Sequence, residues 1–402
     1  MLVRRVEVTD LRSYAAASLD LGPGITVLLG ANGQGKTNLL EAVVRAATGS
    51  SHRVASDTPL VRMGADLGVI RLELQTDEGR TRRLELEVGT GRRTRTRVDG
   101  QDVRRASDAL GVLRVVLFAP EDLAIVRGQP DERRRFLDDL LSQRRPAYAA
   151  AKSEYDRVLR QRNQLLRGAR GLSGSAADAA LATLDTWTTQ LLTHGAGLLA
   201  ARIAVVHALA GGLDETYRRI ADRPDPVSVV YESSTGRRIV GSPDAGVPDR
   251  EPLLAELQEA QAAVAAEERS RGVTLVGPHR DDLAISIGDL PSRTHASQGE
   301  AWSLALALRL ASYEVLADVG DRPVVLLDDV FSELDDRRRA QLAEACLTWE
   351  QVLVTAAVEA DVPVVGQYVD VRMDDGRTEL APRPADPADG ESNPPGDGTS
   401  AP

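Results

Sequence analysis

The stretch GANGQGKT, Gly30 to Thr37, follows the pattern G-x-x-x-x-G-K-[ST] of a phosphate-binding loop. Glycines let such a loop turn its backbone N–H groups inward around a phosphate chain, while the lysine reaches the β- and γ-phosphates and the final hydroxyl ligates Mg²⁺. We therefore predict that a nucleotide contacts all eight residues: Gly30, Ala31, Asn32, Gly33, Gln34, Gly35, Lys36 and Thr37. The predicted metal ligand among them is Thr37.

The flanking segments support this interpretation over a chance glycine-rich turn. The apolar run GITVLLG precedes the loop and has the length of a buried strand. The run NLLEAVVRAA follows it, with apolar residues on one helical face. A strand, a glycine loop and a helix together direct a helix amino terminus at phosphate.

Bulk composition limits the class of protein. The chain has 402 residues, which favours two domains or one domain with a large insertion, and 42% of them are hydrophobic. Its single cysteine, Cys346, forms no internal disulfide framework and suits a reducing cytoplasm. The formal net charge of −11 excludes a uniformly basic nucleic-acid binder, so any DNA contact must be local.

No membrane segment is predicted. The amino-terminal residues contain arginines without the apolar region of a secretory signal. The most apolar stretch, AGLLAARIAVVHALAGG from Ala196, carries Arg202 and His207 in its middle and is short for a membrane span. A buried helix is the better interpretation. Without a predicted signal or membrane segment, we expect a cytoplasmic location.

Four regions of the chain differ in composition and in hydrophobic pattern. Residues 1–130 indicate an α/β unit with β-rich additions, since GVIRLELQT, RRLELEVG and RTRTRVDG alternate as strands do. Residues 131–271 are rich in charged and alanine residues and predict helices, with one strand-like intrusion at VSVVYESS. Residues 272–380 resume a parallel sheet with PVVLLDDVF and EQVLVTAAV. Residues 381–402 are proline-rich and acidic and predict a disordered tail.

A second chemical motif is PVVLLDDVFSELD. Its apolar residues, Val324 to Leu327, predict a buried strand whose carboxyl end delivers Asp328 and Asp329 to the edge where phosphate-binding loops gather. We assign Asp328 to Mg²⁺ and Asp329 to orienting or deprotonating the attacking water. An exposed turn at a strand end is the alternative for this motif alone.

A third motif, SQGE, precedes a long amphipathic helix. Ser297 and the following N–H groups lie at the predicted helix start, which creates a second phosphate-binding surface. One nucleotide cannot easily use both surfaces, because the glycine loop already surrounds its phosphates. We therefore expect a head-to-tail pair of subunits, each offering Ser297 to the other's nucleotide; an ordinary capped helix is the alternative.

In this order, GANGQGKT, SQGE, LLDD and SELD resemble an ABC-type ATPase head that binds ATP and Mg²⁺. The resemblance places Ser297 and Gly299 in the signature motif, Asp335 in the D-loop and Thr355 at the switch position that often holds histidine. The segment between Thr37 and Ser297 is much longer than in a transporter ATPase, which favours the SMC-like branch. The predicted fold class is thus α/β, a P-loop ATPase head with β-rich additions and an inserted, mainly helical arm domain.

Further blocks are similar to the RecF family of bacterial DNA replication and repair proteins. They are DLRSY, NLLEAV, VVLFAPEDL, RRRFLDDLL, LVGPHRDDL and LLDDVFSELD, and they cover nearly the whole chain except the acidic tail. The resemblance implies an ATP-controlled dimeric clamp with weak, DNA-stimulated ATPase activity, acting at gaps or single-strand/double-strand junctions. It also implies recombinase loading with RecO and RecR partners and support of the SOS response.

Two features depart from the family pattern. RecF-like proteins commonly continue the signature as SQGQQ, whereas Glu300 here places a negative charge near the phosphate expected from the partner subunit. The usual Q-loop glutamine is not evident in LFAPEDL, so that role is not assigned to Glu121 or Asp122.

The preferred DNA candidate is GRRTRTRVDG. Arg93, Arg95 and Arg97 alternate, so that on a strand they project from one face, with Arg92 at its start. Such a row could contact successive phosphates without reading bases, although exposed hairpins often carry arginines.

Two other classes of protein stay open. A transporter ATPase would need a membrane partner and a compact insertion, and a small-molecule P-loop kinase would not explain SQGE followed by SELD.

Overall fold

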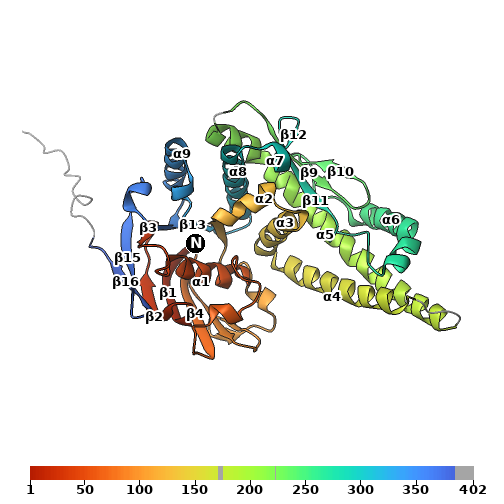
Figure 1. Ribbon diagram of the computed structural model, residues 1–402, viewed down its shortest axis with the longest axis horizontal. Coiled ribbons are helices and arrows are strands. Elements are labelled where there is room, and N and C mark those ends of the chain that lie inside the picture. Colours follow the sequence, from red (N-terminus) through yellow and green to blue (C-terminus); the bar gives the residue numbers. More distant parts are fainter. Residues whose placement is uncertain (171–174, 222, 385–402) are drawn as a thin grey trace, which may run out of the picture.

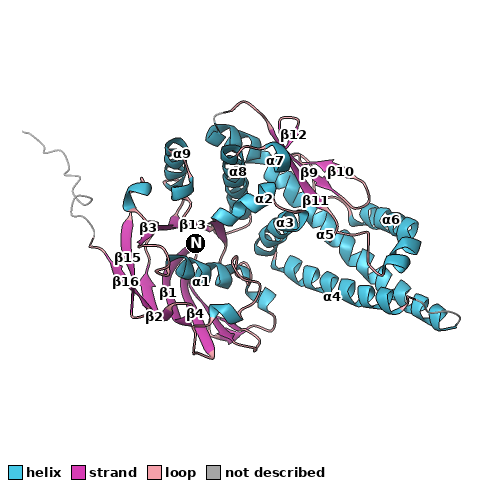
Figure 2. Cartoon of the chain, viewed as in Figure 1, coloured by secondary structure: helices cyan, strands magenta, loops and turns pink. Residues whose placement is uncertain are grey.

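The computed structural model describes residues 1–170, 175–221 and 223–384. A head built on two large sheets carries an elongated, mainly helical arm that extends to one side (Figures 1 and 2). This arrangement agrees with the predicted head and inserted arm. Of the predicted disordered tail, residues 385–402 lie outside the described residues, and the last strand continues past the predicted boundary at 380 to Pro382.

The central sheet has six strands in the order β16-β15-β3-β14-β13-β8. Its strands are β3 (Gly24–Leu29), β8 (Val115–Phe118), β13 (Val324–Asp328), β14 (Gln351–Ala356), β15 (Gln367–Asp374) and β16 (Arg377–Pro382). All neighbours are parallel except β15 and β16. Alternate residues of β13 belong to different hydrophobic cores, Val325 and Leu327 to one and Val324 and Leu326 to the other. Burial on both faces explains why this strand reads as a continuous apolar run.

The second sheet is antiparallel and has the order β2-β1-β4-β5-β6-β7. Its strands are β1 (Leu2–Leu11), β2 (Tyr14–Asp20), β4 (Leu67–Gln75), β5 (Thr81–Gly89), β6 (Arg95–Val98) and β7 (Gln101–Asp102). Helix α1 (Lys36–Thr48) shares one core with this sheet and one face of the central sheet. The predicted strands in residues 67–98 are confirmed, whereas β1 and β2 were not predicted individually.

Long helices make up most of the arm. They are α3 (Pro130–Arg144), α4 (Pro146–Gly168), α5 (Ser175–Ala221) and α6 (Arg250–Arg271). A small sheet of order β10-β9-β11-β12 joins them, formed by β9 (Val227–Glu232), β10 (Arg238–Val240), β11 (Asp282–Ile287) and β12 (Leu290–Pro291). Strands β11 and β12 lie beyond residue 271, so the segment after the predicted arm shares a sheet with it.

The other described α-helices lie outside residues 131–271. They are α2 (Leu123–Arg127), α7 (Ser292–His295), α8 (Gln298–Ala317) and α9 (Asp336–Cys346). Helix α8 is buried along most of its length and packs against α5 (Figure 1).

Helix α5 is the apolar helix anticipated from the sequence. By length and composition its residues Ala179–Ala221 could cross a membrane, since an 18-residue window within them has a mean hydropathy of 1.7, but 61% of that window is buried inside the protein. Arg202 of this helix is buried and donates to both carboxylate oxygens of Asp138 at 2.9 Å. A helix that buries a paired arginine against its own protein fits the predicted core helix.

The block GPHRDDL, Gly277 to Leu283, ties together elements of the arm. Arg202 Nη1 donates to the carbonyl oxygen of Pro278 at 2.6 Å. The buried Asp281 carboxylate accepts from Tyr231 Oη and from the backbone N of Ser234, both at 2.7 Å. The buried polar groups of this set have hydrogen-bond partners, which stabilises the packing of these arm elements.

Candidate functional site: an ATP-binding edge and a separate signature turn

The loop Gly30 to Thr37 joins β3 to α1 at the carboxyl edge of the central sheet. Gly33 and Gly35 have φ angles of 82° and 103°, in the left-handed region that favours glycine. A Cβ atom on Gly35 would lie 2.8 Å from both Ser13 Oγ and Thr378 Oγ1, and one on Gly30 would lie 2.2 Å from the carbonyl oxygen of Val371. These glycines are therefore required by backbone shape and by close neighbours, and they give the loop the form that a phosphate chain fits.

Lys36 lies across this loop. Its Nζ donates to the carbonyl oxygens of Gly30 at 2.6 Å and Ala31 at 3.1 Å. Burial lowers the pKa of the lysine, while Asp329 and Asp328 act in the opposite direction. The ammonium group is thus held at the loop that would surround the phosphates, as the sequence predicted for a lysine that reaches them.

Asp328 ends β13 and is buried. Its Oδ1 accepts hydrogen bonds from Thr37 Oγ1 and from Thr355 Oγ1, each at 2.7 Å. The pairing of β13 with β14 sets Asp328 beside Thr355, and the start of α1 supplies Thr37. A hydroxyl and a carboxylate at one point are ligands that Mg²⁺ accepts. No group of three or more His, Cys, Asp or Glu side chains within residues 1–170, 175–221 and 223–384 could hold a metal, so nucleotide phosphates and water would have to complete this site.

Asp329 follows in a strained conformation, with a φ of 53°. Its backbone N donates to Thr355 Oγ1 at 2.9 Å. Burial raises the pKa of its carboxyl, and Asp328 adds to that rise while Lys36 opposes it. A carboxylate whose pKa is raised and which lies beside the phosphate loop suits the predicted role in orienting or deprotonating water.

The sequence did not single out His52, which lies near the same edge. Its two ring nitrogens are buried and have no hydrogen-bond partner in the described part of the chain. Burial lowers the pKa of the imidazole, although the neighbouring carboxylates Asp328 and Glu41 raise it. No motif marks this residue, because it approaches Asp328 only through the fold.

The signature turn is a complete capping box at the start of α8. Ser297 Oγ accepts from the backbone N of Glu300 at 3.3 Å, and Glu300 Oε2 accepts from the backbone N of Ser297 at 2.8 Å. The turn is tied down by Arg127, which donates to Gln298 Oε1 and to the carbonyl oxygen of Ala296, both at 2.7 Å. Within the described residues, no hydrogen bond or ion pair joins Ser297–Glu300 to the phosphate loop.

Arg338 of α9 links the signature turn to the D-loop. Its Nε donates to Ser303 Oγ at 2.8 Å, and its guanidinium pairs with Asp335, the N-cap of α9. A Cβ atom on Gly299 would lie 2.9 Å from the nearest nitrogen of this guanidinium. The sequence placed Gly299 and Asp335 in separate motifs, and the arginine that joins them was missed.

The charge of Glu300 is compensated locally. Its carboxylate lies 3.3 Å from Arg223, and the hydrogen bonds with Ser297 lower its pKa, with Arg223 and Arg338 adding to that effect. The negative charge that departs from the SQGQQ pattern is therefore balanced by Arg223 and Arg338.

Asp122, near the expected Q-loop position, is engaged elsewhere. It accepts from Arg309 at 2.5 and 3.0 Å and from the backbone N of Ala119 at 3.1 Å. This carboxylate therefore stabilises the fold.

The predicted DNA arginines differ in their surroundings. Arg92 and Arg93 are exposed and precede β6, so only Arg95 and Arg97 share the strand. Arg95 donates to both oxygens of Asp102 at 2.8 and 2.6 Å, and Arg97 pairs with Asp102 and with Glu85 and Glu87 of β5. These hydrogen bonds raise the pKa of both guanidinium groups.

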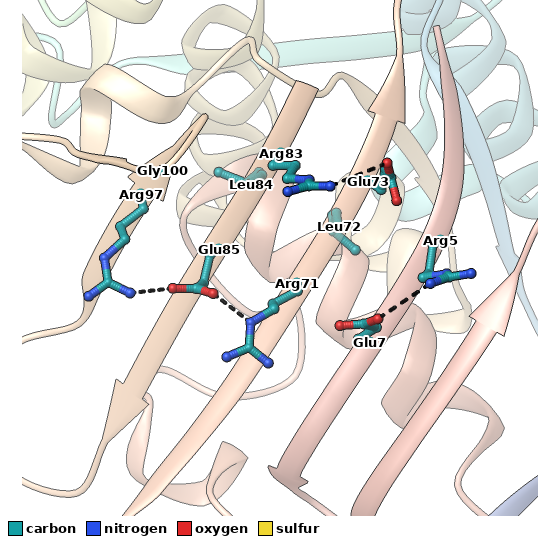
Figure 3. A pocket seen from close by; sticks show the side chains of 10 residues that line it. All are labelled: Arg5, Glu7, Arg71, Leu72, Glu73, Arg83, Leu84, Glu85, Arg97 and Gly100. Atoms are coloured by element: carbon teal, nitrogen blue, oxygen red, sulfur yellow. Dashed lines mark hydrogen bonds and ion pairs between the residues drawn. The ribbon is translucent and has the colours of Figure 1, made fainter. Parts of the chain in front are cut away.

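The surrounding sheet face repeats this pairing of charges. A shallow hollow of about 430 Å³ lies over β1, β4 and β5, where arginines and glutamates alternate (Figure 3). Arg71 donates to Glu85 at 2.5 Å, and Arg83 and Arg5 pair with Glu73 and Glu7 (Figure 3). The face therefore presents neutralised pairs rather than a row of cations.

Comparisons with known proteins identify the family of this chain. The family described as "RecF/RecN/SMC N terminal domain" matches residues 2–379. A solved structure of the recombination mediator protein RecF of the RecFOR pathway, named RecF-ATPrS, has a TM-score of 0.84 at 25% identity and covers 95% of this chain and 98% of its own. The corresponding RecF-ATP structure has a TM-score of 0.83 at 26% identity, covering 94% and 97%.

A more distant structure shares the fold alone. The SMC head bound to the C-winged helix domain of ScpA has a TM-score of 0.56 at 16% identity and covers 96% of this chain and 99% of its own. The predicted resemblance to RecF and the predicted ABC-type head are confirmed. Since the family model matches nearly the whole chain, this protein belongs to the RecF/RecN/SMC N-terminal domain family.

Proposed function

We propose that this protein is a recombination mediator of the RecF kind, an ATP-controlled DNA-binding protein of replication and recombinational repair. The observation that carries the proposal is the hydrogen-bonded set Thr37–Asp328–Thr355–Asp329 beside Lys36, with a capped signature turn elsewhere in the same chain. Relatives at 25% and 26% identity, solved as RecF-ATPrS and RecF-ATP, support the choice of ATP.

The residues of the edge divide the chemistry of ATP hydrolysis between them. The loop amides and Lys36 offset the charge of the phosphates, and Thr37 with Asp328 would hold Mg²⁺, which neutralises charge on the β- and γ-oxygens when bound. Asp329 orients the attacking water and accepts its proton, for which its raised pKa is suited. Hydrolysis is weak and DNA-stimulated in this proposal, and it resets a clamp.

Pairing of two subunits follows from the second surface. Ser297, the backbone N–H groups of α8 and the nearby Arg338 can receive the γ-phosphate of a partner's ATP, since none of them is tied to the phosphate loop of its own subunit within the described residues. ATP then becomes part of a head-to-tail interface, so that nucleotide controls dimerisation. The clamp would act in the cytoplasm at gaps or single-strand/double-strand junctions, with RecO and RecR as partners and with a role in the SOS response.

The test measures ATP hydrolysis with and without gapped duplex DNA. We expect slow turnover that gapped DNA accelerates, and an Asp329→Asn protein that binds ATP but hydrolyses it at a rate at least tenfold lower, since about 1.4 kcal/mol of lost transition-state stabilisation already gives tenfold. Glu314→Gln, which removes an exposed carboxylate on α8, is the control and should behave as wild type. Wild-type turnover by Asp329→Asn would remove the hydrolysis assignment, and turnover that ignores DNA would favour a transporter ATPase or a small-molecule kinase.

A further inference from the structure

The arm carries an open hollow rich in arginine between the carboxyl ends of α4 and α6. These two helices extend away from the head (Figure 1). Its volume is about 530 Å³. Arg160, Asn163, Gln164 and Arg167 line it from α4, and Arg271 lines it from α6. Among the residues that the structure describes, no carboxylate lines the hollow.

A buried ion pair fixes the two helices that form the hollow. Arg162 and Glu268 are both 1% exposed and lie 2.6 Å apart, and Arg162 Nη1 also donates to Thr274 Oγ1 at 2.8 Å. Asn163 Oδ1 accepts from the backbone N and the hydroxyl of Thr274 at 2.8 and 2.7 Å. Since the oxygen takes both hydrogen bonds, the amide nitrogen of Asn163 is the group that can donate to a ligand.

A further arginine, Arg170, packs beside Gly272, which lines the hollow in the turn after α6. Gly272 adopts a φ of 69°, and a Cβ atom there would lie 3.1 Å from Arg170 Cδ and 3.2 Å from Arg167 Cγ. The aliphatic stems of these two arginines therefore pack on the glycine, which leaves their charged ends to solvent. We define the arm arginine patch as Arg160, Arg167, Arg170 and Arg271, all of which are exposed.

The patch differs from the β6 hairpin in how its charges are balanced. Among the described residues, Arg160, Arg167 and Arg170 form no ion pair, and only Arg271 has one, at 2.7 Å from Glu267. Arg95 and Arg97 must break bonds to Asp102, Glu85 and Glu87 before they can neutralise a phosphate. An arginine without a competing carboxylate has no such contact to lose and retains its full attraction for an anion.

We infer that the arm arginine patch binds the phosphodiester backbone of DNA without reading its sequence. Arg160 and Arg167 are two helical turns apart on α4, a rise of about 10.5 Å, which spans roughly three steps of 3.4 Å along a DNA strand. Guanidinium groups at such a spacing can contact separate phosphates of one strand. The inference rests on the proposed DNA-binding function and gives it a location on the arm.

The experiment measures the affinity for a short fluorescein-labelled duplex, and for the matching single strand, by fluorescence anisotropy over a range of salt concentrations. The test variant combines Arg160→Ala, Arg167→Ala and Arg170→Ala. The control variant combines Arg157→Ala, Arg237→Ala and Arg238→Ala, which removes the same charge from three exposed arm arginines that are paired with Glu154, Glu256 and Glu232. A third variant replaces the three patch arginines by lysine and keeps their charge.

For duplex DNA, the slope of log K against log salt is negative. We expect its magnitude to decrease by up to about 2.7 in the test variant, at about 0.9 for each lost phosphate contact. The control and lysine variants should keep slopes close to that of wild type. If wild type binds DNA but the test variant has the same salt slope as the control variant, the DNA-binding role of the patch is overturned and the proposed function is not. Wild type that fails to bind either DNA, with or without ATP, overturns the proposed function together with the patch. A loss confined to the single strand would assign the patch to that strand of a gapped substrate.

Discussion

Thr355→Val tests whether one hydroxyl holds the catalytic edge together. Thr355 is fully buried, its Oγ1 donates to Asp328 at 2.7 Å, and the same oxygen accepts from the backbone N of Asp329 at 2.9 Å. Valine keeps the shape but removes both hydrogen bonds, so that Asp328 retains only the donor from Thr37 and the N–H of Asp329 has none. A hydrogen bond to a charged group contributes about 1.5–3 kcal/mol and a neutral one about 1 kcal/mol, so we expect a loss of about 2–4 kcal/mol in the free energy of unfolding.

The assay combines thermal unfolding with ATP hydrolysis. We expect a melting temperature several degrees lower and slower hydrolysis, because the strained backbone at Asp329 loses the contact that fixes it. Thr26→Val is the matched control, since Thr26 is also buried in the central sheet and its hydroxyl forms no hydrogen bond within the described residues. Thr355→Ser keeps the hydroxyl and should restore most of the activity. If Thr355→Val has the same melting temperature as Thr26→Val and hydrolyses ATP at the wild-type rate, the role given to the Thr355 hydroxyl is refuted.

Four further outcomes are expected. Lys36→Ala should remove most ATP affinity, measured by calorimetric titration, because the ammonium offsets phosphate charge in the ground state. Ser297→Arg should leave ATP binding within a subunit intact and abolish the ATP-dependent dimer in light scattering; equal dimers of both proteins without nucleotide would contradict the shared site. Glu300→Gln should strengthen that pairing modestly, because glutamine retains the capping box while Arg223 and Arg338 lose their counter-charge. Burial raises the pKa of Asp139 to about 6 from 3.8, so the carboxyl favours the fold when protonated and this contribution is lost as pH rises through about 6. Asp139→Asn should therefore match wild type in urea unfolding near pH 4 and exceed it by about 1–3 kcal/mol above pH 7, whereas a constant difference would exclude this carboxyl as the source.

The sequence was sufficient for the parts of the site that are contiguous in the chain. The phosphate loop, the strand ending in Asp328 and Asp329, and the serine-capped start of α8 each follow from local rules of periodicity, turn geometry and capping. Their order along the chain was enough to indicate an ABC-type head, and the family comparison confirms it. The strands of residues 67–98 followed from alternation, because one face of that sheet is exposed and the other buried.

Contacts between distant segments required the tertiary structure. Thr355 meets Asp328 only because β13 and β14 pair in parallel at one register, and Arg338 reaches Gly299 only because α9 lies beside α8. Whether the positive charges of Arg95 and Arg97 are paired likewise depends on carboxylates from β5 and β7, which a linear pattern of arginines does not contain. Local sequence thus determined which groups this protein places at the ends of its strands and helices. The tertiary structure decided which of those groups meet, because hydrogen bonds and ion pairs form over a few ångströms in space whatever the separation along the chain.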